Sequence, residues 1–439
     1  MNKALDIDVY QQRRRDLMRA METGVAIIPS APVRPRNGDV EYQYRPDSDF
    51  YYLTGFSEPD AVAVLCPGRS SGEYLLFCRE KNPDKELWYG KRAGLEGAVS
   101  SFDADDAFPI EDLDDILPRL LEDQPKVFAS LGRYTDFDSK VMQWMNEVRL
   151  RSRKGINAPH EMVDLSYILH EQRLIKRKDE LSIMKKAGRI SAEGHIRAMQ
   201  TCQPGMTEQQ VQAEMEYVFR KNGSTYNAYP SIVAGGENAC ILHYIDNNAV
   251  LNDGDLLLID AGAELECYAS DISRTFPVNG KFNSEQKALY EIVLAAQHAA
   301  FEKCQPGQHW NAPHEAAVKV ITEGLIDVGL LIGETNELIE INAYREFYMH
   351  RTGHWLGMDV HDVGDYQIDQ QWRELEPGMV FTVEPGIYIG KNPAVDPKWH
   401  DIGIRIEDDV VIKKAGHEIL TNAVPSSIDE IEYLMSNSA

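Results

Sequence analysis

The sequence predicts an α/β protein with two domains, the second of which is built from two similar halves. Three observations lead to this prediction. The chain has 439 residues, which is more than one ordinary domain of roughly 100 to 200 residues. Short apolar runs alternate with amphipathic helical patterns up to about residue 172. Beyond that point two short sequence patterns each occur twice, in the same order.

The composition predicts a soluble globular protein and excludes several classes. Asp and Glu number 70 against 45 Lys and Arg, which gives a formal net charge of -25. Such a surface repels phosphate backbones and anionic lipid, so we expect no nucleic-acid partner and no membrane binding. No stretch approaches the ~18 continuous apolar residues of a membrane span. Acidic residues gathered around bound cations would also contribute to this excess.

The N-terminus and the cysteines both predict a cytoplasmic protein. Residues 1–22 contain basic residues but no apolar h-region or small-residue cleavage site, unlike a secretory signal. The six cysteines are scattered without the paired spacing of a zinc site or a disulfide framework. They are Cys66, Cys78, Cys202, Cys240, Cys267 and Cys304.

The first domain is predicted to span residues 1–173. Runs such as VAIIPS, AVAVLCPG and EYLLFCRE have the apolar character of strands, and IEDLDDILPRLLEDQ has that of an acidic helix. A long amphipathic helix pattern then extends over residues 174–200 and begins in a dense run of charges. We therefore place the second domain at residues 174–439.

The first repeated pattern is CQPG, at residues 202–205 and 304–307. Each copy lies between two helical stretches. The first copy continues into a capping box, Thr207 to Gln210, which predicts the start of the next helix.

The second repeated pattern links two acids. LNDGDLLLIDAG at 251–262 and LEPGMVFTVEPG at 375–386 share the form Leu-x-x-Gly, five mostly apolar residues, an acid, one residue and Gly. Asp260 and Glu384 are therefore equivalent positions. Either echo alone can arise by chance, but two in the same order favour a duplicated domain.

Asp260 and Asp271 are predicted to face each other. Asp260 ends the apolar run DLLLI, and Asp271 begins the return strand DISRTFPV. A two-residue turn at Leu265 and Glu266 would place the two aspartates opposite each other, where like charges are destabilising. Two separately solvated aspartates are the alternative. Because Asp260 closes an apolar run, burial is favoured, and a buried pair must share a proton or hold a cation.

Two further acids have the same surroundings. Glu384 follows the apolar run MVFTV, and Glu407 lies within IGIRIEDDVVI. The alternation of that segment predicts one strand with Arg405 and Glu407 on the same face. A surface ion pair between these two residues is the alternative.

Histidines are concentrated in HRTGHWLGMDVHDVG, residues 350–364. The spacing of four between His350 and His354 would suit one helix face, but three glycines favour a loop and a bent strand. Any single histidine is more often structural than a ligand. Asp359 and Asp362 are expected to be structural.

Four carboxylates and a histidine form an oxygen-rich ligand set. Such a set suits Mn(II), Co(II), Fe(II) or Mg(II) and argues against a thiolate zinc site. Two divalent cations would balance four carboxylates, as in two-metal hydrolases whose ions lie ~3.5 to 4 Å apart.

The motifs IDAGAELECYASDISRTFPV, HWLGMDVHDVG, FTVEPGIY and GIRIEDDVVI resemble the pita-bread metallopeptidases, the family of methionine aminopeptidase, prolidase and aminopeptidase P. The resemblance covers essentially the whole chain. It implies a creatinase-like N-terminal α/β domain and a pita-bread catalytic domain with an internal pseudo-two-fold repeat. The metal ligands that it implies are all present: Asp260, Asp271, His354, Glu384 and Glu407.

Segments 44–56, 80–94 and 230–244 are most similar to the aminopeptidase P branch. That branch releases the first residue of peptides with proline at the second position. A prolidase, which takes only Xaa-Pro dipeptides, is the close alternative, followed by a hydrolase of non-peptide C–N bonds and a non-catalytic binding protein. Arg351 and Thr352 depart from the small, glycine-containing pair that is usual in the branch, which bears on peptide length.

The resemblance also implies a mechanism and an assembly. A hydroxide bridging two metals, most readily Mn(II) and otherwise Co(II) or Zn(II), would attack with Glu384 as general base. His361, His243 and His350 would contact the substrate carbonyl or the leaving nitrogen. A homo-oligomer, a tetramer rather than a dimer, is implied. The remaining substrate-pocket residues are Tyr229, Arg405 as the partner of an acid, Arg153, and Trp88 across a subunit contact.

Overall fold

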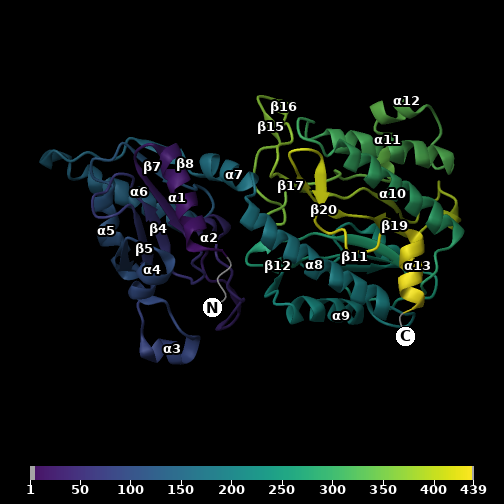
Figure 1. Cartoon of the computed structure of the whole chain (residues 1–439), viewed down its shortest axis with the longest axis horizontal. Coiled ribbons are helices and arrows are strands. Elements are labelled where there is room, and N and C mark those ends of the chain that lie inside the picture. The colour runs from purple at the N-terminus through teal and green to yellow at the C-terminus, as the bar shows by residue number, and fades with distance from the viewer. Residues whose placement is uncertain (1–4, 438–439) are drawn as a thin grey trace. The chain divides into compact units, whose positions relative to one another are not determined.

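The computed structural model describes residues 5–437. The chain forms two compact units, which divide between Gln172 and Arg173 (Figure 1). Within residues 5–437, no helix is long and apolar enough to cross a membrane.

The N-terminal unit is built on a mixed six-stranded sheet with the strand order β6-β5-β4-β1-β7-β8. The central strand β1 runs antiparallel to β4 and parallel to β7. Continuous apolar runs form the inner strands because both of their faces are buried. The strands are β1 (Val25–Pro29), β4 (Val62–Leu65), β5 (Tyr74–Cys78), β6 (Asp106–Pro109), β7 (Lys126–Ala129) and β8 (Glu161–Asp164), with a separate hairpin of β2 (Pro35–Asn37) and β3 (Val40–Glu41).

Helices α5 and α6 close the core of this unit. Leu117 and Trp144 from these helices pack with Val64 and Phe77 from the sheet, and all four are buried. Truncating a buried tryptophan to alanine costs about 3 to 5 kcal/mol, so Trp144 is a main support of this unit. The helices are α1 (Ile7–Met21), α2 (Ser48–Thr54), α3 (Pro83–Tyr89), α4 (Gly94–Phe102), α5 (Leu113–Leu120), α6 (Thr135–Arg149) and α7 (Ser166–Leu174).

The C-terminal unit consists of two similar halves (Figure 1). In the first half, helices α8 and α9 pack against each other, and in the second half α10 packs against α11. The first half has two three-stranded sheets, β10-β11-β14 and β13-β12-β9, and the second half has one, β17-β20-β21, with the strand pairs β15-β16 and β18-β19.

The principal helices are α8 (Lys178–Thr201), α9 (Glu208–Lys221), α10 (Ser284–Lys303), α11 (Ala312–Asp327), α12 (Thr335–Glu340) and α13 (Ile428–Ser436). The strands of the first half are β9 (Tyr226–Asn227), β10 (Ile232–Gly235), β11 (Leu256–Asp260), β12 (Ala263–Leu265), β13 (Tyr268–Ala269) and β14 (Ser273–Pro277). Those of the second half are β15 (Gln367–Ile368), β16 (Gln371–Trp372), β17 (Val380–Val383), β18 (Gly386–Ile389), β19 (Ile402–Arg405), β20 (Asp408–Ile412) and β21 (His417–Ile419).

The two repeated sequence patterns contact each other in the same way in both halves. The Gly205 N–H donates to the Leu251 carbonyl at 2.9 Å, and the Gly307 N–H donates to the Leu375 carbonyl at 2.9 Å. Both glycines are left-handed, with φ of 91° and 82°, a conformation that costs other residues free energy. In each half, the CQPG segment therefore bonds to the Leu-x-x-Gly segment in the same way. The predicted duplication is confirmed.

The helix starts follow local capping. Thr207 and Gln210 bond reciprocally and begin α9, as predicted. The long helix predicted over residues 174–200 begins later, at Lys178, because Arg177 and Glu180 form its capping box. Residues 175–177 are extended instead, and Ile175 bridges to Met379.

Candidate metal centre and active site

Each of the four predicted acids lies where a strand ends or is interrupted. Asp260 is the last residue of β11, and Asp271 lies two residues before β14. Glu384 follows β17, and Glu407 occupies the gap between β19 and β20. At such breaks the regular ladder of hydrogen bonds stops, so the side chains of neighbouring strands can converge on one point.

The predicted register of the first pair was wrong by two residues. Asp260 pairs with Ser273, not with Asp271, because the turn lies at Glu266 and Cys267, both left-handed. A shift of two residues preserves the face of the sheet. Asp271 and Asp260 therefore still meet, and the Tyr229 hydroxyl bonds to both carboxylates.

The prediction of one continuous strand for IGIRIEDDVVI was also wrong. β19 pairs with β18, whereas β20 pairs with β17 in a different sheet. The strand is broken because its two ends belong to two sheets. Glu407 lies at the break and is 2% exposed, so it is no surface acid.

A cavity of about 760 Å³ lies over these acids. This volume is within the range of about 300 to 1,000 Å³ that is typical of small-ligand sites. All lining residues belong to the C-terminal unit. The sequence-predicted residues among them are Tyr229, His243, Asp260, Asp271, His350, His354, His361, Glu384, Arg405 and Glu407.

The floor of the cavity is formed by four carboxylates and His354: Asp260, Asp271, Glu384 and Glu407 are the acids. These carboxylates shift one another's pKa strongly. Burial and neighbouring carboxylates raise the pKa of Glu407 well above its ordinary value. Burial likewise raises the pKa of Glu384 to about 7 and raises that of Asp260. Burial opposes ionisation of Asp271 too, but the hydrogen bond with His354 holds its pKa below the ordinary value. The floor therefore carries more negative charge than its surroundings compensate.

Arg405 is the arginine that compensates part of this charge. Its Nη2 donates to Asp260 Oδ2 at 2.7 Å, and its Nε donates to Ser273 Oγ at 2.9 Å. The Ser273 hydroxyl in turn donates to Glu407 Oε2 at 2.7 Å. Arg405 thus orients one acid directly and a second one through a serine.

His354 faces the acids with one nitrogen. Its Nδ1 bonds the Trp355 carbonyl at 3.0 Å, which fixes the tautomer because a carbonyl only accepts. Its Nε2 lies 3.4 Å from Asp271 and 3.6 Å from Glu384. Burial disfavours its charged form, but these carboxylates raise the pKa of His354 to about 9.

The other histidines of the cavity differ in whether their ring nitrogens are hydrogen-bonded to the protein. His243 and His361 line the cavity and are exposed, and their rings form no hydrogen bond with any residue of 5–437. His350 is bonded on both sides, with Nδ1 to the Arg351 carbonyl at 2.7 Å and Nε2 to the Tyr388 hydroxyl at 2.8 Å. His243 and His361 therefore have nitrogens available to a substrate, whereas His350 would have to exchange a partner.

The sequence prediction missed an aromatic wall of the cavity. Trp310, Tyr366 and Trp372 line it. The Trp310 ring lies 4.8 Å from Tyr366, and Trp355 stacks on Tyr366 behind it with 4° between the ring planes. No local pattern could have revealed this wall, because Trp310 is far along the chain from Tyr366 and Trp372, which lie at the β15–β16 hairpin.

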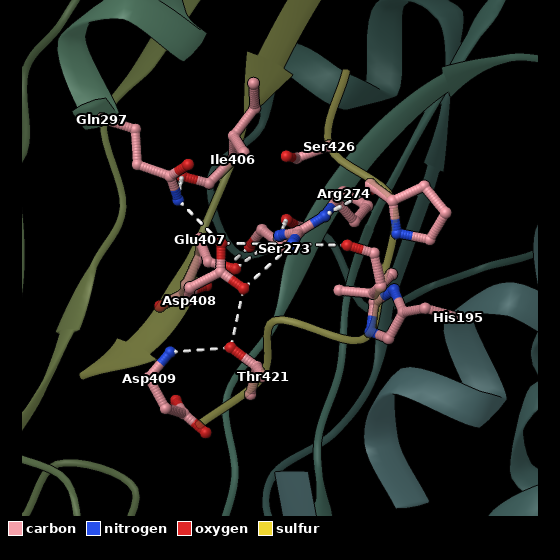
Figure 2. A network of polar contacts seen from close by, with 12 residues as sticks. His195, Ser273, Arg274, Gln297, Ile406, Glu407, Asp408, Asp409, Thr421 and Ser426 are labelled. Carbon is pink, nitrogen blue, oxygen red and sulfur yellow. Dashed lines mark hydrogen bonds and ion pairs between the residues drawn. The ribbon is translucent and has the colours of Figure 1, made fainter. Parts of the chain in front are cut away.

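A second polar network supports the carboxylates from behind (Figure 2). Arg274 is fully buried and donates to the Ser273 and Glu407 carbonyls at 2.9 and 2.6 Å. It also pairs with Asp408 at 2.9 Å. Arg274 therefore fixes the backbone on both sides of the contact between Ser273 and Glu407.

Gln297 of α10 also belongs to this network, and its side chain contacts the backbone next to two of the acids (Figure 2). Its Nε2 lies 3.3 Å from the Val383 carbonyl and 3.2 Å from the Ile406 carbonyl. These carbonyls directly precede Glu384 and Glu407. One amide thus connects the two glutamate-bearing chain segments.

Trp88 and Arg153 do not line the cavity. Both are exposed residues of the N-terminal unit, and the Trp88 side chain on α3 is 81% exposed. Their predicted contribution to a substrate pocket stays a prediction. Asp362, expected to be structural, is buried between Arg173 and Lys176 at 2.6 and 2.8 Å.

The residues of the floor fit divalent cations. Ligand atoms of Asp271, His354 and Glu407 lie within 4.8 Å of one another. His354 Nε2 faces the acids, and the carboxylates outnumber the one arginine bonded to them. Buried carboxylates in such excess require cations, and oxygen-rich sets with one imidazole suit hard or borderline metals.

Comparison with known proteins identifies the family to which the chain belongs. Residues 182–414 match metallopeptidase family M24, and residues 10–128 match the N-terminal domain of aminopeptidase P. The Xaa-Pro aminopeptidase of Escherichia coli K12 is 42% identical over 428 residues, 97% of either chain. The solved aminopeptidase PepP of Pseudomonas aeruginosa is 56% identical, with a TM-score of 0.98 over 99% of both chains. A zinc-substituted E. coli aminopeptidase P in complex with product has a TM-score of 0.96 at 41% identity, also over 99% of both chains.

A duplicated α/β unit with a buried, carboxylate-rich metal-binding group defines the chain as a metallopeptidase. The chain belongs to metallopeptidase family M24, and the predicted resemblance to aminopeptidase P and the predicted fold class are confirmed. It is a hydrolase, a metal-dependent exopeptidase.

Proposed function

We propose that the chain is an Xaa-Pro aminopeptidase, which removes the first residue of a peptide whose second residue is proline. The observation that carries this proposal is a floor of four carboxylates and one histidine beneath a cavity with two free histidines and an aromatic wall. The 42% identity to the E. coli Xaa-Pro aminopeptidase supports the same assignment. Prolidase activity, confined to dipeptides, is the competing outcome.

The residues proposed to hold two divalent cations are Asp260, Asp271, His354, Glu384 and Glu407. We assign Mn(II) to the site, with Co(II) or Zn(II) as substitutes, because oxygen ligands dominate. When bound, the cations supply an attacking water of lowered pKa and polarise the scissile carbonyl.

Glu384 is the proposed general base. The Thr382 hydroxyl lies 3.3 Å from its Oε1, and His354 lies on the same side at 3.6 Å. These contacts hold the carboxylate toward the cavity, where Oε2 can take the proton of the attacking water. Arg405 keeps Asp260 from rotating away and so preserves the arrangement of the floor.

The remaining lining residues can contact the substrate groups on both sides of the scissile bond. The negative floor attracts the ammonium group of a peptide N-terminus. The bond before proline has no N–H, so recognition falls to the carbonyl and the ring. His361 and His243 are the proposed donors to the carbonyl oxygen and the leaving nitrogen, because their nitrogens are free. Trp310 and Tyr366 offer flat apolar surface to the ring, while Tyr229 and His350 shape the pocket beneath.

We further propose a cytoplasmic homo-oligomer, a tetramer rather than a dimer. At the end of α3, Leu87, Trp88 and Tyr89 are 83%, 81% and 80% exposed. Such a contiguous apolar tip supports burial against another copy. Of the residues described, Cys66, Cys78, Cys202, Cys240, Cys267 and Cys304 are free thiols, which fits a reducing compartment.

The test compares release of the first residue from an Xaa-Pro dipeptide, an Xaa-Pro-Yaa tripeptide and a longer peptide, with the metal content of the same sample measured. The proposal expects cleavage of the tripeptide and the longer peptide, abolished by a chelator and restored by Mn(II). Activity confined to the dipeptide would establish a prolidase. Full activity of metal-free protein would refute the mechanism.

A further inference from the structure

We propose that Arg351 binds a substrate carboxylate on the segment that follows proline, so that short zwitterionic peptides, above all free tripeptides, are preferred. This inference rests on the proposed Xaa-Pro aminopeptidase activity and names the class of peptide that the site favours.

Arg351 is the cation of the cavity lining that has no acidic partner. Of the two arginines in the lining, Arg405 is buried and paired with Asp260 at 2.7 Å. Arg351 forms no ion pair with any carboxylate of residues 5–437. Its charge is therefore available to a ligand in the cavity.

Contacts with neutral groups hold the Arg351 guanidinium in place. It lies over the Trp372 ring, 5.2 Å from the ring centroid, and donates to the Asn311 side-chain oxygen. The Asn311 amide nitrogen donates to Glu315 at 2.7 Å, which turns its oxygen toward the arginine. Trp372 belongs to the tight β15–β16 hairpin. A guanidinium has five N–H donors, so this support leaves donors free for a planar carboxylate.

The lining of the cavity therefore carries charges of both signs. The acids form the floor, and Arg351 lies with Trp372 and Trp310 elsewhere in the same lining. The ammonium group of a peptide is attracted to the floor. A carboxylate on the far side of the scissile bond would meet Arg351 and add a second, oppositely signed contact. A free tripeptide carries both charges within its short length.

The experiment uses the full-length manganese enzyme and four peptides. Ala-Pro-Ala as free acid is compared with its C-terminal amide, and amidated Ala-Pro-Glu-Ala is compared with amidated Ala-Pro-Gln-Ala. The wild type is expected to favour one or both carboxylate-bearing peptides by about five- to tenfold in kcat/KM, mainly through KM, which is the size of a partly exposed charge-assisted contact.

The variant Arg351→Met removes the charge and keeps an unbranched, shorter apolar side chain. The acid-to-neutral ratio is expected to fall to about one. Arg345→Met is the matched control, because Arg345 also acts electrostatically on His314 but does not line the cavity. Its ratio is expected to equal that of the wild type. Melting temperature and metal content are measured for each variant, and Arg351→Lys is expected to recover part of the ratio.

The two peptide pairs separate the sources of the carboxylate. A preference in the tripeptide pair assigns the contact to a peptide C-terminus, as proposed. A preference confined to the longer pair would assign it to an acidic side chain and would overturn the preference for free tripeptides. Unchanged ratios in Arg351→Met, or an equal loss in Arg345→Met, would overturn the inference. Absence of Xaa-Pro cleavage in every variant would instead overturn the proposed function.

Discussion

The C-terminal unit buries two groups of charges that are arranged in opposite ways. Asp362 lies between Arg173 and Lys176, and the three side chains are each 1% exposed. On the cavity floor, four carboxylates have one bonded arginine, Arg405. The first group is balanced by its own chain, and the second requires charge from outside. Buried acids with sufficient cationic partners indicate structure, whereas an uncompensated excess beside a cavity indicates a cation site.

The largest effect is expected on the floor of the cavity. Replacing Glu384 by Gln should lower kcat by about 10² to 10⁴, because it removes the proposed proton acceptor. Steady-state kinetics on an Arg-Pro-Pro peptide, with bound metal measured, provide the check. Glu376→Gln, at an exposed acid outside the cavity lining, is the control. Wild-type turnover in the Glu384→Gln variant would remove Glu384 from its role.

A change in the Asp362 group, which is balanced by Arg173 and Lys176, should lower the stability of the fold. Replacing Asp362 by Asn is expected to lower the free energy of unfolding by about 3 to 5 kcal/mol, because the buried Lys176 loses its carboxylate partner and Arg173 loses one of its carboxylates, while it still contacts Asp359 at 2.9 Å. Urea unfolding of the metal-free protein measures this loss. A loss below about 1 kcal/mol would show that the two cations can reach water and that the group is not a closed one.

A neutral buried histidine of the same unit should make the stability of the protein depend on pH. His195 is fully buried and bonds the Ala261 carbonyl at 2.9 Å, and burial lowers its pKa to about 4. The unfolded chain binds a proton there below about 6.5, whereas the folded protein does not, so its stabilisation is present above about pH 6.5 and is lost as pH falls toward 4. The loss is about 3 kcal/mol.

The check for His195 is the pH dependence of unfolding in the wild type and in His195→Asn. The wild type should lose about 3 kcal/mol more than the variant between about pH 6.5 and 4. Parallel curves would mean that the imidazole becomes protonated inside the folded protein.

The smallest effect is expected for Glu407→Gln, which directly compares the acids of the cavity floor with the Asp362 group. In metal-free protein, Glu407→Gln should raise the free energy of unfolding by about 1 kcal/mol, because it removes an acid whose pKa is raised by burial and by its neighbours. The same urea titrations measure it beside Asp362→Asn. A destabilisation as large as that of Asp362→Asn would mean that both groups are balanced by the chain.

Two of the cavity's acids could be predicted from the sequence pattern because they close apolar runs and repeat at equivalent positions, whereas Asp271 and Glu407 were predicted from the strands that they begin or lie within. Asp260 and Glu384 were found through their shared motif. The error of two residues in the register of Asp260 and Asp271 left both on the same face of the sheet, because side chains alternate with a period of two. The break between Arg405 and Glu407 was missed because alternation continues through it, although the two flanking strands join different sheets.

Other residues of the site depend on distant contacts and carry no local signal. Trp310 and Trp372 are far apart in the chain and look like ordinary apolar or loop residues. Gln297 lies inside a helix whose pattern shows only amphipathicity, and its contacts with Val383 and Ile406 join positions 86 and 109 residues away. Such contacts follow from tertiary packing, which periodicity does not contain.

The Gln297 amide has a mechanical consequence for the centre. The Val383 and Ile406 carbonyls both rest on one nitrogen, so a displacement of either segment pulls on the same side chain. Glu384 and Glu407 should therefore fluctuate together. Because Glu407 also accepts from Ser273 of β14, this coupling extends to the half of the unit that carries Asp260 and Asp271. The shared hydrogen bonds, more than the position of any single acid, would then set which cations the centre can accommodate.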